Sequence, residues 1–138
     1  MSAVTVDAGV WVAAAGASDP RCDVSRIFLT EVGRRGFRLV APAIVLVEVG
    51  CALARRSRDA EGPRRLTEAM LAPDFVSYVP VDGPLLARSF TMGTERFLRG
   101  ADALYVAAAD GAGNALVSWD GEHLARGAGV SPDSWLEE

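Results

Sequence analysis

The sequence contains no lysine, so all 14 of its basic residues are arginine. This absence excludes a Schiff-base lysine, a phosphate-binding-loop lysine and a receiver-type phosphorylation site. His123 is the only histidine, which excludes a metal site built from several histidines; an isolated histidine is most often an ordinary surface residue. Only two cysteines are present, Cys22 and Cys51, and their spacing matches no motif, which favours free thiols in a reducing cytosol.

Long hydrophobic runs are also missing. The longest stretch without a charged residue covers residues 8–18, which is too short to cross a bilayer. No basic segment that would start a signal peptide precedes it. We therefore expect a cytoplasmic protein that does not associate with membranes.

The 138 residues are 50% hydrophobic, enough for one core, and we expect a single domain over residues 1–138. A Rossmann unit is excluded because no glycine-rich turn follows the first strand. Strands alternate with helices along the chain, which predicts an α/β domain with a central, mostly parallel sheet and helices on both faces. The expected strands are 3–7, 37–40, 75–81 and 115–117, and the expected helices are 10–15, 25–35, 42–56, 64–71, 84–92 and 100–109.

Four acidic residues stand at apolar segments. Asp7 and Asp120 each follow a predicted strand, Asp102 opens an apolar helix, and Glu48 lies in the middle of one. An ionised carboxylate in such a setting costs several kcal/mol unless it is paired, hydrogen-bonded or bound to a metal. Each aspartate alone is equally well explained as a helix cap or a first-turn acid, and Glu48 by a buried arginine partner.

Taken together, the four acids predict one cluster, because the carboxyl ends of parallel strands share one edge of the sheet. Such a cluster repels itself and needs a divalent cation, and oxygen ligands suit Mg²⁺ or Mn²⁺. A cation of this kind activates water and stabilises charge on a phosphoryl group. The pattern therefore indicates metal-assisted phosphodiester hydrolysis.

The order and spacing of these segments resemble the PIN-domain ribonucleases, specifically the VapC-like toxins of type II toxin–antitoxin pairs. The resemblance covers nearly the whole chain and is carried by residues 4–10, 42–53, 99–109 and 116–124. It implies Asp7 and Asp102 as the main metal ligands, with Glu48 and Asp120 completing the acidic pocket and Ser118 hydrogen-bonded to a carboxylate or a metal-bound water.

The resemblance also implies the activity and the partners. We expect a Mg²⁺- or Mn²⁺-dependent endoribonuclease that hydrolyses RNA with water, forms a homodimer and is blocked by a VapB-like antitoxin lying across its active-site groove. The alternative is a catalytically weak or inactive PIN-like module that only binds RNA or a protein partner. Its one support is Gly9, which stands where the family commonly has serine, threonine or asparagine.

The arginines are unevenly distributed. Eight of them, with only three acids, fall between residues 34 and 65, and this span predicts a basic rim that grips the RNA backbone, including Arg55 and Arg56. Arg99 is a further candidate because it lies one helical turn before Asp102. For any single arginine, a solvated helix surface explains the pattern at least as well. The chain has 18 acidic residues. Without the four clustered acids, the remaining acidic residues balance the arginines in number, so the net charge of −4 equals the formal charge of the predicted site.

Overall fold

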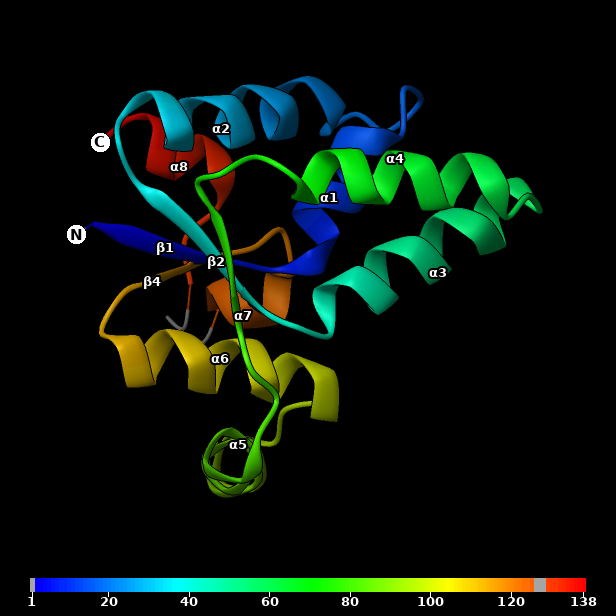
Figure 1. The fold of residues 1–138 in the computed structure, drawn as a ribbon. Coiled ribbons are helices and arrows are strands. Elements are labelled where there is room, and N and C mark those ends of the chain that lie inside the picture. The colour runs from blue at the N-terminus through cyan, green and yellow to red at the C-terminus, as the bar shows by residue number, and fades with distance from the viewer. Residues whose placement is uncertain (1, 126–128) are drawn as a thin grey trace.

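A four-stranded sheet forms the centre of the molecule in a computed structural model that describes residues 2–125 and 129–138 (Figure 1). The strand order is β3-β2-β1-β4, and each neighbouring pair is parallel. The prediction of an α/β fold around a mostly parallel sheet is confirmed. The strands are β1 (Ala3–Val6), β2 (Arg38–Pro42), β3 (Val76–Val79) and β4 (Ala115–Val117).

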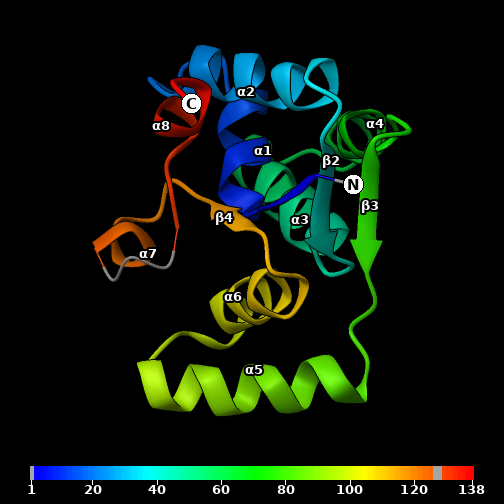
Figure 2. The same ribbon diagram turned by 90° about the vertical axis from the view of Figure 1, so that its left-hand side faces the viewer.

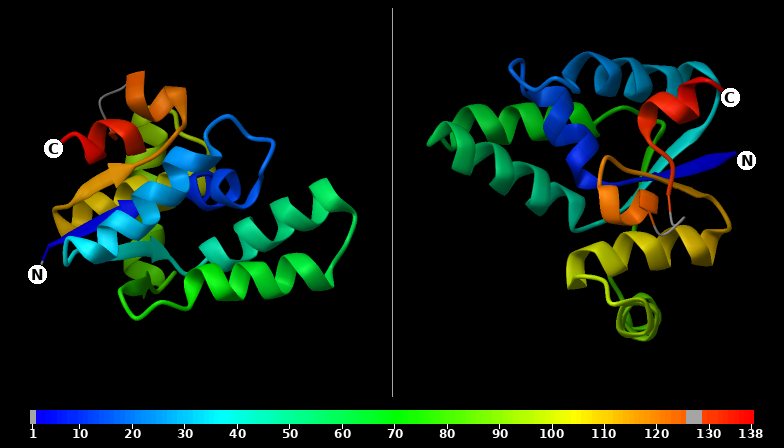
Figure 3. Two further views of the ribbon diagram at one scale, coloured as in Figure 1. Left: turned by 90° about the horizontal axis from the view of Figure 1, so that it is seen from above. Right: turned by 180° about the vertical axis from the view of Figure 1, so that it is seen from behind.

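Helices cover both faces of this sheet. On one face α6 lies against the strands with α5 outside it, and on the other lie α1, α2 and α8 (Figure 2). The helices α3 and α4 form an antiparallel hairpin, the α3–α4 hairpin, which projects from the body of the molecule (Figure 3). The helices are α1 (Ala8–Ala15), α2 (Cys22–Arg34), α3 (Val45–Ser57), α4 (Glu61–Leu71), α5 (Gly83–Arg96), α6 (Gly100–Ala112), α7 (Gly121–Ala125) and α8 (Pro132–Leu136).

Two of these helices are apolar nearly all round, as expected for helices enclosed in a core. In α1 the buried side chains include Val10 and Trp11, and in α6 every residue from Ala103 to Ala109 is buried. Both helices begin at the carboxyl edge of the sheet, α1 directly after β1. Their burial fixes the position of the acids at their first turns. No helix in the described part of the chain has the length and apolar character needed to cross a membrane.

The structure corrects the predicted start of α3. The helix begins at Val45 rather than at Pro42, which is the last residue of β2. The pairing of β2 with β1 ends at Val40, so the amide hydrogen that Pro42 lacks is not needed by that neighbour. As a consequence Glu48 lies in the first turn of α3 and not in its middle. The short helix α8 was not predicted from the sequence.

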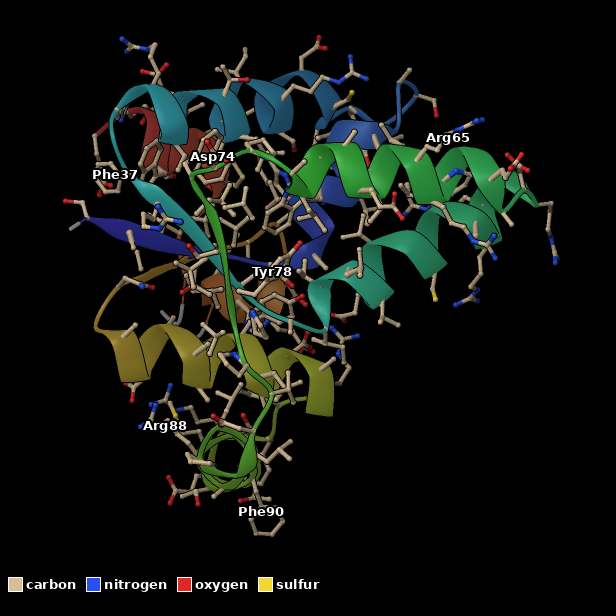
Figure 4. The ribbon with its side chains drawn as sticks, in the orientation of Figure 1. Phe37, Arg65, Asp74, Tyr78, Arg88 and Phe90 are labelled. Carbon is tan, nitrogen blue, oxygen red and sulfur yellow. The ribbon has the colours of Figure 1, made fainter. Side chains whose placement is uncertain are left out.

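The outer surface of α5 is apolar. Leu86 and Phe90 on this helix are 52% and 74% exposed, and Phe97 directly after it is 84% exposed. Phe90 points away from the rest of the molecule (Figure 4). Side chains of this size and exposure, close together on one element, are typical of a contact surface.

We expect Phe28→Ala to lower the free energy of unfolding by about 3–5 kcal/mol, because it leaves a cavity in the core. Phe28 of α2 is fully buried and packs edge-on against Trp135 of α8, with ring centroids 5.2 Å apart. The matched control is Ile27→Ala, since Ile27 precedes it and is 57% exposed; this change should stay within about 0.5 kcal/mol. Urea denaturation followed by circular dichroism measures both, and equal losses would contradict this packing.

Candidate metal centre

The pairing of β1 with β4 brings the first site residues together. Val6 is aligned with Val117, so Asp7 and Ser118 leave the sheet side by side. The Ser118 hydroxyl donates to Asp7 Oδ2 at 2.7 Å, and it accepts from the backbone N–H of Asp120 at 2.9 Å. Ser118 is fully buried. One hydroxyl therefore holds both acids at the carboxyl edge of the sheet.

Asp102 and Asp120 are joined by an arginine. Arg99 donates through Nε to Asp102 Oδ2 and through Nη2 to Asp120 Oδ2, both at 2.9 Å. Its side chain is 72% exposed, against 19% for Asp102 and 20% for Asp120. Exposed pairs of this kind contribute only about 0–1 kcal/mol, so a divalent cation can compete with Arg99 for these carboxylates. Arg99, which we expected to contact RNA, here neutralises part of the acidic cluster.

The partner of Glu48 is a tyrosine and not the buried arginine that the sequence left open. The Tyr105 hydroxyl donates to Glu48 Oε1 at 2.6 Å. Tyr105 is buried, and burial together with the negative charge of Glu48 raises the pKa of its hydroxyl far above the usual range, so it stays a donor. Sequence reasoning missed this residue, although its position three after Asp102 places both on one face of α6.

The two inner acids, Asp7 and Glu48, both have raised pKa values. Burial raises the pKa of Asp7 against the opposing effects of Ser118 and His123, and the charge of Asp102 raises it further. Burial also raises the pKa of Glu48, with Asp7 and Asp102 adding repulsion. The group is therefore a cluster of mutually repelling carboxylates that a cation would stabilise.

Asp120, at the rim, behaves differently. Partial burial opposes its ionisation, but the backbone N–H of Glu122 and the charges of His123 and Arg99 outweigh this and lower its pKa. Its Oδ1 accepts from Glu122 N–H at 2.8 Å, so Asp120 also caps α7. The capping role and membership in the acidic cluster, which we treated as alternatives, coexist in this residue.

His123 is buried, with 1% of its side chain exposed, so the expectation of a surface histidine is wrong. Neither ring nitrogen has a hydrogen-bond partner within residues 2–125 and 129–138. A buried polar group without a partner costs about 1–3 kcal/mol. The helix α7 turns this ring toward Asp102, whose Oδ1 lies 3.7 Å from His123 Nε2.

Asp102, Asp120 and His123 form a group that could hold a metal ion. One ligand atom from each lies within 4.8 Å of the other two. Among the described residues, Asp7 and Glu48 stand outside this set, although their charges act on it. Two carboxylates and an imidazole without a hydrogen-bond partner among the described residues, with two further carboxylates nearby, are a ligand set that fits a divalent cation.

A cavity of about 270 Å³ opens beside Asp7 and Asp120 and is lined also by Arg56, Arg21 and Gly9, but not by Arg55. Arg21, which sequence reasoning missed, stacks its guanidinium over the Trp119 ring at 5.2 Å. Gly9 is exposed, and a side-chain carbon built there would meet nothing within 4 Å. The glycine is therefore not required by packing.

The basic span between residues 34 and 65 is not one surface. Arg34 and Arg35 both pair with Glu31 at the end of α2, and Arg38 donates to Ser77. The others lie on or next to the α3–α4 hairpin, including Arg55 and Arg56 in the last turn of α3. Arg65 lies on α4 (Figure 4). Only this second group extends from the acidic cavity, which it reaches through Arg56.

Comparison with known proteins places this arrangement in a family. The PIN domain model matches residues 4–130. No curated protein sequence matches the chain. Among solved structures, it is similar to the Sarcin-Ricin loop cleaving toxin VapC20 of Mycobacterium tuberculosis, with 21% identity, a TM-score of 0.75, and coverage of 90% of this chain and 95% of the other.

Two further structures show the same fold in complexes. VapBC2 of Rickettsia felis, bound to a DNA fragment from its promoter, has 14% identity and a TM-score of 0.71, with 94% of this chain and 96% of the other covered. A toxin–antitoxin complex of Klebsiella pneumoniae has 14% identity and a TM-score of 0.70, with 94% and 97% covered. At sequence identities of 14% to 21%, the structural similarity to these proteins shows the fold alone.

Without metal, we expect Asp7→Asn to be at least as stable as the wild type at pH 7, because asparagine still accepts from Ser118 but carries no buried charge. The raised pKa of Asp7 means that protonation removes the cost of burial. The difference in free energy of unfolding between Asp7→Asn and the wild type should therefore shrink as the pH falls through that pKa. Urea denaturation in EDTA at several pH values measures this. A large loss of stability at pH 7 would show instead that the Asp7 charge is fully compensated by protein groups.

Arg99→Gln should raise the affinity for Mn²⁺ by about two- to tenfold, because it removes a cation that competes for Asp102 and Asp120. Isothermal titration calorimetry measures the effect. The matched control is Arg88→Gln, which removes the same charge beside Gly111 at the far end of α6 and should leave the affinity unchanged. Equal effects of the two substitutions would indicate that only the overall charge matters.

Proposed function

Because this chain belongs to the PIN domain family, we propose that it is a divalent-metal-dependent endoribonuclease that acts as the toxin of a VapBC-type toxin–antitoxin pair. The observation that carries the proposal is the convergence of four acids at one edge of the parallel sheet: Asp7 and Asp120 follow β1 and β4, and Glu48 and Asp102 lie in the first turns of α3 and α6. Ser118 and Tyr105 hold two of these acids by hydrogen bonds. A bound cation would offset the repulsion between these carboxylates.

In this proposal Asp7, Glu48, Asp102 and Asp120 hold Mg²⁺ or Mn²⁺, directly or through water. A cation held there supplies Lewis-acid polarisation of the phosphodiester and activation of water. Ser118 keeps the Asp7 carboxylate facing the site. Glu48 accepts from Tyr105 through Oε1, and its raised pKa suits it to take a proton from an attacking water.

The RNA would lie along the cavity beside Asp7. Arg56 and Arg21 line this cavity and are placed to neutralise backbone phosphates. Arg55 shares a second hollow on the hairpin with Arg56 and Arg58 and would extend the contact. Arg99 would reach the RNA only after leaving Asp102 and Asp120.

The proposed partners follow from the family and from the surface. The similar structures include toxin–antitoxin complexes, which supports a VapB-like antitoxin as the partner that covers the acidic cavity. The exposed apolar residues of α5 support a homodimer. We place the protein in the cytoplasm, where its RNA substrate and antitoxin would be found.

We expect the purified protein to cleave single-stranded or looped RNA with Mg²⁺ or Mn²⁺ and to lose this activity in EDTA. Asp7→Asn and Asp102→Asn should each reduce the rate on the order of 100-fold or more, because each removes a charge that holds the cation. A gel assay of end-labelled RNA measures the rates. The matched control is Asp110→Asn, since Asp110 lies exposed on the same helix as Asp102 but outside the cluster, and it should keep the wild-type rate.

The same assay tests the alternative of an inactive binding module. Gly9 and the occupation of Asp102 and Asp120 by Arg99 are the observations in its favour. A protein that retains RNA in a gel shift but never cleaves it with either cation would support the module. Cleavage that persists in EDTA would contradict both readings.

A further inference from the structure

We propose that His123 is a nitrogen ligand of the cation, so that the centre combines carboxylates with one imidazole and prefers Mn²⁺ or a similar transition-series ion to Mg²⁺. This inference rests on the proposed function and narrows the identity of its metal. It departs from the oxygen-only ligand set that the sequence pattern indicated.

The first support is the burial of an unpartnered ring. His123 is 1% exposed, and neither of its nitrogens is hydrogen-bonded to any described residue. Buried polar atoms almost always have partners, so an imidazole without one calls for a missing ligand. A neutral imidazole is the commonest protein ligand for metals.

The second support is the direction of the ring. His123 Nε2 lies 3.7 Å from Asp102 Oδ1, too far for a hydrogen bond. Two atoms that bind one ion at about 2.1 Å each lie roughly 3–4.2 Å apart, which includes this distance. Asp120 contributes an oxygen to the same group within 4.8 Å.

Asp102 divides its two oxygens between different partners. Oδ2 accepts from Arg99, whereas Oδ1 faces His123. The space between Asp102 and His123 is therefore on the side of the carboxylate that the guanidinium does not occupy. A cation can enter there while Arg99 remains bonded to Asp102 Oδ2.

The donor set determines the preferred ion. Magnesium favours oxygen ligands and binds imidazole weakly, whereas the affinity of nitrogen-containing sites rises from Mn²⁺ through Co²⁺. A centre that combines carboxylates with one imidazole therefore gains selectivity for the transition-series ion from His123. Loss of the imidazole should reduce this selectivity and leave the binding of Mg²⁺ nearly unchanged.

The test is pulsed electron paramagnetic resonance of Mn²⁺ bound to the full chain, prepared without a histidine tag. Since His123 is the only histidine, an imidazole ¹⁴N modulation can have only one source. We expect the modulation in the wild type and its loss in His123→Leu. In that variant Mn²⁺ affinity should fall roughly tenfold or more, while Mg²⁺ affinity, measured by competition, changes much less.

Leucine is chosen because it fills a buried site of similar size and removes no hydrogen bond made with a described residue. In EDTA, His123→Leu should melt at or above the wild-type temperature; a marked decrease, with unchanged Mn²⁺ affinity, would assign the histidine to an ion pair with Asp102 and overturn the proposal. Bound Mn²⁺ without a nitrogen signal in the wild type would also overturn it, and would leave the proposed nuclease intact. Failure of the wild type to bind either cation would instead contradict the proposed function itself.

Discussion

The parallel pairing of β1 with β4 is the constraint on which the site depends. It places Asp7 and Ser118 next to each other where both strands end, and the hydroxyl of Ser118 then connects Asp7 with Asp120. The helices α1 and α6 start at this same edge because their apolar surfaces are enclosed in the core. Packing energy therefore holds the carboxylates together against their repulsion.

Two different basic side chains approach this cluster from opposite sides. Arg99 is exposed and bridges Asp102 and Asp120 from the solvent side. His123 is buried and approaches Asp102 from the protein side. Because surface ion pairs are weak, the arginine can be exchanged for another cation at little cost, whereas the imidazole is held in place by its burial. Arg99 thus neutralises part of the cluster by contacts that a metal ion could replace.

The arginines between residues 34 and 65 lie on different surfaces, although they are close together in the sequence. Counting arginines between residues 34 and 65 suggested one basic rim, yet Arg34, Arg35 and Arg38 lie at the opposite end of the sheet from the cavity. Arg56 lines the cavity and Arg55 does not, although they are neighbours on α3. Arg21, far from both in the sequence, joins Arg56 there through the fold. Linear charge density does not specify which residues share a surface, because successive helix positions point in different directions.

The sequence by itself determined the fold class and the family resemblance, because strands that alternate with apolar helices favour a parallel sheet covered on both faces. It also predicted that the four acids lie together and that Ser118 has a role beside them. Only the tertiary structure decided that Tyr105 is the partner of Glu48, that Arg99 bridges Asp102 and Asp120, and that His123 is buried beside them. These facts depend on how side chains from separate elements meet, and a single histidine or tyrosine in a sequence has no pattern that reveals its neighbours.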